Sequence, residues 1–209
     1  MFTDRILVKL YISKVHITQP SRHIRKLDHK IVFYKFRDMF SPIPPSSFKG
    51  YLRHLAYIVV SRSGGKYLKA YFSLFGSDIR TQGDPSITLK SKEGKLIVSL
   101  REGFKKEYLK KRTRPGIRIN RITGSTTREA LLFSEYVEIT VRKPIIFALE
   151  FKEPLSKEEE ELLAAALNLM RSGGVLGGWA SKGMGFIEKL EVEPADFLEK
   201  SSKIGDFLG

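Results

Sequence analysis

The 209-residue chain contains no cysteine. It therefore has no disulfide framework, no cysteine-ligated zinc site and no thiol nucleophile, and we expect a cytoplasmic location. Long apolar runs are also lacking, because none approaches the roughly 18 to 20 residues that a membrane span needs. Hydrophobic residues still make up 42% of the chain, enough to bury a core, which excludes wholesale disorder. Any catalysis must rest on carboxylates, histidines or a metal ion.

Acidic residues are scarce in the first 128 positions, which hold 28 Lys and Arg against 8 Asp and Glu. Residues 129–209 hold 9 Lys and Arg against 15 Asp and Glu. The net charge of +14 is therefore the sum of +20 in residues 1–128, called the basic front below, and −6 in residues 129–209, called the acidic rear. Solubility needs only a few charges of either sign. The front therefore predicts a polyanionic partner, with nucleic acid favoured over a membrane surface. The alternative is a generally basic protein without such a partner.

The spacing of apolar residues predicts both strands and helices. Strands with period-two alternation or short apolar runs are predicted over 5–17, 31–36, 95–100, 131–151 (broken at Lys143-Pro144) and 186–192. A helix is predicted from Ser46-Ser47, whose hydroxyls are suited to capping it, to about Arg62. A second helix begins with a capping box of Ser156 and Glu159 and ends at Gly173-Gly174.

This order of elements predicts an α+β protein with a ferredoxin-like (RNA-recognition-like) βαββαβ core. We expect a single domain over 1–195, with the core at about 5–17, 46–102 and 131–193. Insertions are expected at about 18–45 and 103–130, and a peripheral tail at 196–209. The second insertion is strongly basic and predicts contact with a nucleic-acid backbone, with a solvated basic loop as the alternative.

Six of the thirteen residues between 173 and 185 (GGVLGGWASKGMG) are glycine. The segment leads from a predicted helix into a predicted strand, the opposite direction to a Walker loop or a dinucleotide-binding fingerprint, which excludes both. Two interpretations stay open. The loop packs against a nucleic-acid backbone with Trp179 as a stacking platform, or it is a tight connection with Trp179 in the core.

Three segments together resemble the RAMP superfamily of CRISPR-associated proteins. Residues 43–53 (IPPSSFKGYLR) resemble its Ser-Ser-x-Lys-Gly helix start. Residues 120–137 (NRITGSTTREALLFSEYV) resemble the segment after its thumb, and residues 177–185 (GGWASKGMG) resemble its glycine-rich loop. The resemblance is closest to the backbone subunits of type III (Csm-type and Cmr-type) effector complexes.

The resemblance implies a CRISPR RNA (guide) binding subunit of an antiviral interference complex, in which the basic insertion, about Lys105 to Thr127, is a thumb-like projection. Its partners would be CRISPR RNA, target single-stranded RNA and other effector subunits, with copies stacked as a filament on the guide. The implied RNA-binding residues are Ser46, Ser47, Lys49, Arg53, Arg114, Arg118, Asn120, Arg121, Thr123, Arg128, Gly177, Gly178, Lys182, Gly183 and Gly185. A helix N-terminus with hydroxyls and nearby cations is independently suited to phosphate.

The resemblance also implies metal-dependent cleavage of target RNA by an aspartate in the loop after the first strand. Asp28 precedes Ser46 by about the family's spacing, and Asp38 is a second candidate. The aspartate would hold Mg²⁺ or another divalent cation, or position the attacking 2′-hydroxyl. The alternative is that Asp28 only pairs with a neighbouring cation, Arg25, Lys26 or Lys30.

Other functions remain open at this point. One is a CRISPR RNA-processing endoribonuclease of the same superfamily, in which His23 or His29 acts as a metal-free general acid or base. Another is a non-catalytic capping or interaction subunit that ends the filament. A plain RNA-binding domain outside CRISPR systems is the last.

Overall fold

The computed structural model describes residues 5–17, 33–76, 93–119, 122–178 and 180–201. Within these ranges, the backbone alone is described for 117–119 and 126–134. In the described part of the chain, no helix combines the length and the apolar run that a bilayer span needs.

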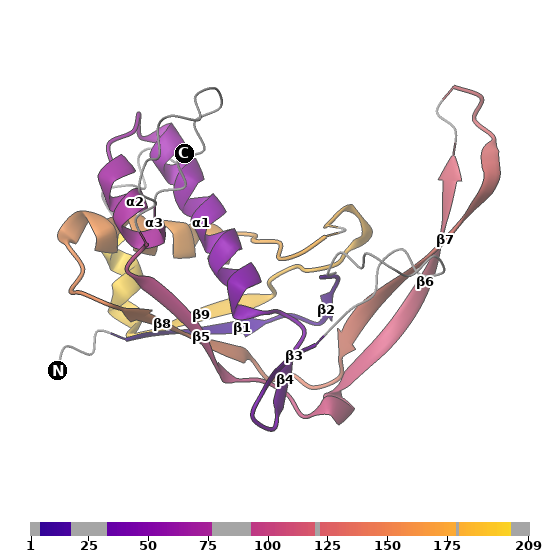
Figure 1. The fold of residues 1–209 in the computed structure, drawn as a ribbon, viewed down its shortest axis with the longest axis horizontal. Coiled ribbons are helices and arrows are strands. Elements are labelled where there is room, and N and C mark those ends of the chain that lie inside the picture. The colour runs from indigo at the N-terminus through magenta and orange to yellow at the C-terminus, as the bar shows by residue number, and fades with distance from the viewer. Residues whose placement is uncertain (1–4, 18–32, 77–92, 120–121, 179, 202–209) are drawn as a thin grey trace, which may run out of the picture.

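A four-stranded sheet forms the body of the molecule (Figure 1). Its strands are β1 (Ile6–Tyr11), β5 (Leu96–Glu102), β8 (Ile145–Phe151) and β9 (Lys189–Glu193). Their order across the sheet is β5-β8-β1-β9, and all neighbours are antiparallel. The helices α1 (Pro45–Arg62), α2 (Leu68–Phe75) and α3 (Lys157–Arg171) gather on one face of this sheet. The predicted α+β class is confirmed.

The core lies between the sheet and these helices. Alternate side chains of β1, namely Ile6, Val8 and Leu10, are buried toward the helices, as the period-two pattern predicts. Phe48 of α1 stacks on Phe147 of β8 with ring centroids 4.4 Å apart and planes 3° apart. This contact fixes α1 over the centre of the sheet.

A long hairpin, called the arm below, projects from the body (Figure 1). It consists of β6 (Leu109–Ile119) and β7 (Thr126–Ile139), preceded by a short 3₁₀ turn, η1 (Lys106–Tyr108). The two-residue strand β2 (Lys14–Val15) joins β7 on its other side. Residues 131–139 pair with β6 rather than with the four-stranded sheet, while Val137 and Ile139 are buried in the core, where they were expected. Alternation defines a strand without defining its partner, so the sequence pattern does not separate β7 from β8.

A small hairpin of β3 (Tyr34–Phe36) and β4 (Met39–Ser41) leads into α1. The helix begins at Pro45, with Pro44 as its N-cap and no side-chain cap. The prediction that a serine hydroxyl caps this helix is therefore wrong. Proline at the first helical position has a suitable fixed φ and lacks an N–H, so the helix starts before Ser46 and Ser47, which lie in its first turn.

The predicted capping box of α3 is confirmed. The Ser156 hydroxyl accepts from the Glu159 N–H, and the Glu159 carboxylate accepts from the Ser156 N–H (2.7 Å). Glu159 is nevertheless buried, and Lys95 lies 3.1 Å from it. Burial alone would raise the pKa of Glu159, but hydrogen bonds from Ser73, Ser156 and Lys95 hold this pKa below its usual value.

The segment after β9 packs against α3 rather than lying free. In the 3₁₀ segment η3 (Ala195–Ser201), Phe197 and Leu198 are buried, and the Asn168 side-chain amide donates to the Leu198 carbonyl (2.9 Å). The first part of the expected peripheral tail therefore belongs to the core.

We predict that Glu159→Gln destabilises the protein by about 1–3 kcal/mol at pH 7, because it weakens the cap and leaves Lys95 without its buried partner. A carboxyl with a lowered folded pKa contributes stability above its unfolded pKa, and this contribution is lost as the pH falls through the folded value. The difference between variant and wild type should therefore shrink below about pH 4.5. Urea unfolding of both proteins at several pH values measures this difference in the free energy of unfolding. Glu158→Gln, exposed in the same turn, is the control; an equal loss in both variants would contradict the prediction.

Candidate nucleic-acid interface

The segment Lys14–His16 joins the glycine-rich loop to the arm. On one side, Lys14 and Val15 pair with Glu138 and Val137 of β7. On the other, the Lys14 carbonyl accepts from Gly185 N–H (2.7 Å) and the His16 carbonyl accepts from Gly178 N–H (2.8 Å). The buried His16 ring also places Nδ1 2.6 Å from the Glu135 carbonyl of β7. The loop and the arm are thus held at a fixed separation by one short strand.

Close packing requires glycine at three positions of the loop, Gly174, Gly177 and Gly185. A Cβ on Gly177 would lie 2.7 Å from the His16 carbonyl oxygen, and one on Gly185 would lie 2.2 Å from the Leu176 carbonyl oxygen. Both residues also have positive φ, +97° and +78°. By contrast, Gly183 has φ +78° with open space around it. The tight-connection interpretation therefore accounts for Gly177 and Gly185, whereas Gly183 faces open space.

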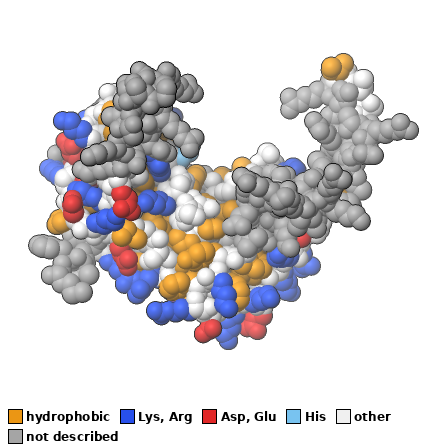
Figure 2. Space-filling view, in the orientation of Figure 1, with side chains coloured by type: hydrophobic (Ala, Val, Ile, Leu, Met, Phe, Trp, Pro, Cys, Tyr) orange, Lys and Arg blue, Asp and Glu red, His pale blue; other side chains and the backbone are white. Residues whose placement is uncertain are grey.

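The loop meets the arm at Lys182, within the 3₁₀ turn η2 (Ala180–Lys182). The Arg114 guanidinium of β6 donates to the Lys182 carbonyl (3.3 Å), so two of the expected RNA-binding residues lie together although they are far apart in sequence. Figure 2 shows that the molecule is hollowed between the body and the arm, with Lys and Arg side chains around the base of the arm. Exposed cations of the described part of β6 are Lys110, Lys111, Arg112 and Arg114.

The N-terminal part of α1 adjoins the same loop. The Val175 N–H donates to the Tyr51 hydroxyl (2.9 Å), which ties the loop to the second turn of this helix. Ser46 is exposed and Ser47 half-buried in its first turn. Gly50 follows with no atom within 4 Å of a Cβ built on it. The start of α1 therefore offers hydroxyls and an open stretch of helix backbone.

Two expected phosphate ligands on α1 are engaged within the protein. The Lys49 ammonium donates to the Leu96 carbonyl of β5 (2.7 Å). Burial lowers the pKa of Lys49, the charges of Lys152 and Arg53 lower it further, and Glu93 opposes them. Arg53 Nε donates to the Tyr71 hydroxyl of α2 (3.1 Å). In this state both cations brace α1 against its neighbours.

Several predicted residues lie beyond what the structure describes. Asp28, His23 and His29 are outside the described residues, as are Trp179, Asn120 and Arg121. Arg118 and Arg128 lie on β6 and β7, but their side chains are not described. Thr123 is exposed in the turn of the arm, with its hydroxyl 2.8 Å from that of Ser125. Among the described residues, no group of three or more His, Asp or Glu could hold a metal ion.

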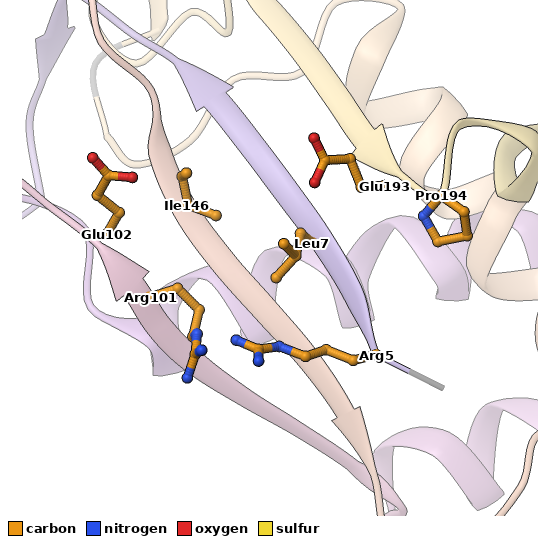
Figure 3. Close-up of a pocket in the computed structure, with 7 residues that line it drawn as sticks. All are labelled: Arg5, Leu7, Arg101, Glu102, Ile146, Glu193 and Pro194. Carbon is orange, nitrogen blue, oxygen red and sulfur yellow. The ribbon is translucent and has the colours of Figure 1, made fainter. Parts of the chain in front are cut away.

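The face of the sheet opposite the helices carries charges of both signs. A hollow of about 500 Å³ lies there. Figure 3 shows its lining residues, Arg5, Leu7, Arg101, Glu102, Ile146, Glu193 and Pro194. Lys9 pairs with Glu193, Arg5 lies 3.8 Å from Glu150, and Lys189 lies 2.5 Å from Glu191. Carboxylates thus lie beside several of the cations on this face and reduce its net positive charge.

A sequence profile of the RAMP superfamily matches residues 34–188. The chain belongs to the RAMP superfamily. Membership implies a CRISPR-associated, RNA-binding function, and RAMP proteins generally bind CRISPR RNA and other Cas subunits. A search of curated proteins found no match to the chain. The matched region contains α1, the arm and the glycine-rich loop, which are the parts of this RAMP protein that meet around the hollow.

Sequence reasoning missed the residues that assemble this interface. Tyr51 has helical apolar spacing, which predicts a core side chain and gives no sign of its hydrogen bond to Val175. His16 stands among apolar residues at the end of a predicted strand. The burial of His16 between two chain segments depends on how those segments are arranged in three dimensions, which the sequence pattern does not specify.

We predict that Gly185→Ala destabilises the RAMP fold by about 2–4 kcal/mol, since the new Cβ is strained by positive φ and meets the Leu176 carbonyl. Gly183→Ala is the matched control, because it has the same φ without the contact. It should cost about 1–2 kcal/mol. Thermal unfolding of both variants measures the difference, and equal losses would show that the close approach to Leu176 is unimportant.

Proposed function

We propose that this chain is a guide-RNA-binding backbone subunit of a type III CRISPR interference complex. In this proposal the sheet of β5, β8, β1 and β9 with its helices is a ferredoxin-like core, and the arm is the thumb. The observation that carries it is the meeting of α1, the glycine-rich loop and the arm around one hollow, tied by Tyr51–Val175, His16–Gly178 and Arg114–Lys182.

The hollow is suited to the backbone of single-stranded RNA. The exposed lysines and arginines of β6 supply positive charge along one side. On the other side of the hollow, the start of α1 supplies a helix N-terminus and the hydroxyls of Ser46 and Ser47. Gly50 costs α1 about 0.5–1 kcal/mol relative to alanine, and the open space beside it lets a phosphate backbone approach closely.

In this proposal Lys49 and Arg53 bind RNA phosphates in addition to bracing α1. Both hydrogen bonds that they make are to neutral oxygens, Leu96 O and Tyr71 Oη. A phosphate is a stronger acceptor for a cation than a neutral oxygen. We expect either side chain to exchange its internal partner for RNA when the guide is bound.

Target cleavage is the second part of the proposal and rests on Asp28. A divalent cation such as Mg²⁺ would stabilise charge that develops at the scissile phosphate. Asp28 would supply a carboxylate ligand to it or orient the attacking 2′-hydroxyl. The support is the spacing of Asp28 before the Ser-Ser-x-Lys-Gly segment that opens α1.

We predict that the protein binds single-stranded RNA with a log affinity that falls linearly with log salt, at a slope of about −0.7 per phosphate contact. Arg114→Ala should weaken binding and make the slope shallower by about 0.7, because one contact is lost. Fluorescence anisotropy across a salt series measures both. Lys157→Ala removes an exposed cation at the start of α3 and should change neither. Failure of the wild type to bind RNA at moderate salt would refute guide binding.

We predict that the reconstituted complex cuts target RNA at regular intervals with Mg²⁺, and that Asp28→Ala abolishes these products without weakening guide binding. Denaturing gels of labelled target measure cleavage. Asp38→Ala, at the second candidate, is the control and should cut normally. Unchanged cleavage by Asp28→Ala would rule out its assignment.

Cutting of a repeat hairpin in EDTA would indicate the processing endoribonuclease, and one copy per complex would indicate a capping subunit.

A further inference from the structure

Exposed apolar side chains cluster on α1 and α2, beyond the start of α1. Tyr57 is 54% exposed, Leu68 43% and Phe72 38%. Tyr57 lies twelve residues after Pro45, about 18 Å along the helix axis. Single exposed apolar residues are ordinary, but large neighbouring ones mark a contact surface. With Tyr71 beneath them, these residues are called the aromatic cluster.

The rings of the aromatic cluster are held in fixed orientations. Tyr71 is buried, and its ring is the floor of the cluster. The Tyr57 ring lies 6.0 Å from it at 57°, and the Phe72 ring lies 5.5 Å from it at 68°. Tilted and edge-on arrangements of this kind are favourable between aromatic rings. Tyr57 and Phe72 therefore present rings that lose little freedom on binding a flat ligand.

Positive charge surrounds the aromatic cluster. No Asp or Glu occurs between residues 45 and 75, which span both helices. The Arg53 guanidinium lies 5.8 Å from the centroid of the Tyr71 ring. Exposed Lys69 precedes the exposed ring of Phe72 by three residues and so lies beside it on the helix surface.

We propose that the aromatic cluster is a second contact for single-stranded RNA beyond the hollow, in which Tyr57 and Phe72 stack on bases and Lys69 attracts phosphates, with Arg53 shared between the two contacts. Every nucleotide carries both a π-face and a negative charge, so one strand satisfies the rings and the cations together. An acidic protein surface would satisfy only the cations. The inference extends the proposed function, because it assigns the RNA strand a path along α1 beyond the hollow.

The first test is RNA affinity of the full chain for a fluorescein-labelled oligouridylate of about 20 nucleotides. We expect the double variant Tyr57→Ser, Phe72→Ser to bind about tenfold more weakly. Replacing the same two residues by Trp should preserve affinity, since stacking surface is kept. Ile97→Ser is the matched control, because Ile97 is 43% exposed on the open face of the sheet. Its affinity should equal that of the wild type, and thermal unfolding of each variant checks that it folds.

The second test locates the bases. With 5-iodouridine in the same oligonucleotide, light should cross-link RNA to Tyr57 or Phe72, identified by mass spectrometry. The variant Arg114→Glu, Lys182→Glu disrupts the hollow and should bind more weakly while keeping this cross-link. If the wild type binds RNA but gives no such cross-link and the Ser variants bind normally, the aromatic cluster is not an RNA contact, and guide binding stands. If the wild type binds no RNA, both proposals fall.

Discussion

The placement of Lys14–His16 between the glycine-rich loop and the arm is the constraint on which the interface depends. This segment joins the arm to the body along β7, in addition to the two ends of the hairpin and the Arg114–Lys182 hydrogen bond. Backbone pairing to β7 on one side and to Gly178 and Gly185 on the other sets the width of the hollow. The buried His16 ring adds a side-chain contact to the Glu135 carbonyl. Small residues are needed in the loop because the backbones approach so closely there.

The uneven charge of the chain follows the same geometry. The basic front supplies β6 of the arm, the start of α1 and the exposed rim of the aromatic cluster. The acidic rear is used internally: Glu159 caps α3 and meets Lys95, while Glu161 accepts from the buried Tyr67 hydroxyl (3.1 Å). On the open face of the sheet, glutamates offset lysines and arginines pair by pair. On the arm, Arg112 also pairs with Glu138 (3.0 Å), while Lys110 and Arg114 are exposed along the proposed RNA path.

Regular elements were predictable where one local signal dominated. The alternation in β1 and the capping box of α3 are local, and both were identified correctly. Where two local signals competed, prediction failed: Pro45 favoured an earlier helix start than the serines that follow it. The short helix α2 was missed, although it carries three of the four residues of the aromatic cluster.

The sequence by itself determined the α+β class, the basic front and membership of the RAMP superfamily, because composition, periodicity and short motifs are properties of contiguous residues. Tertiary structure alone decided that residues 126–139 belong to the arm, that Arg114 meets Lys182, and that Lys49 and Arg53 brace α1. Each of these depends on which strand or helix becomes a neighbour. A strand's alternation specifies which face is apolar, while its partner is chosen by the packing of the whole chain.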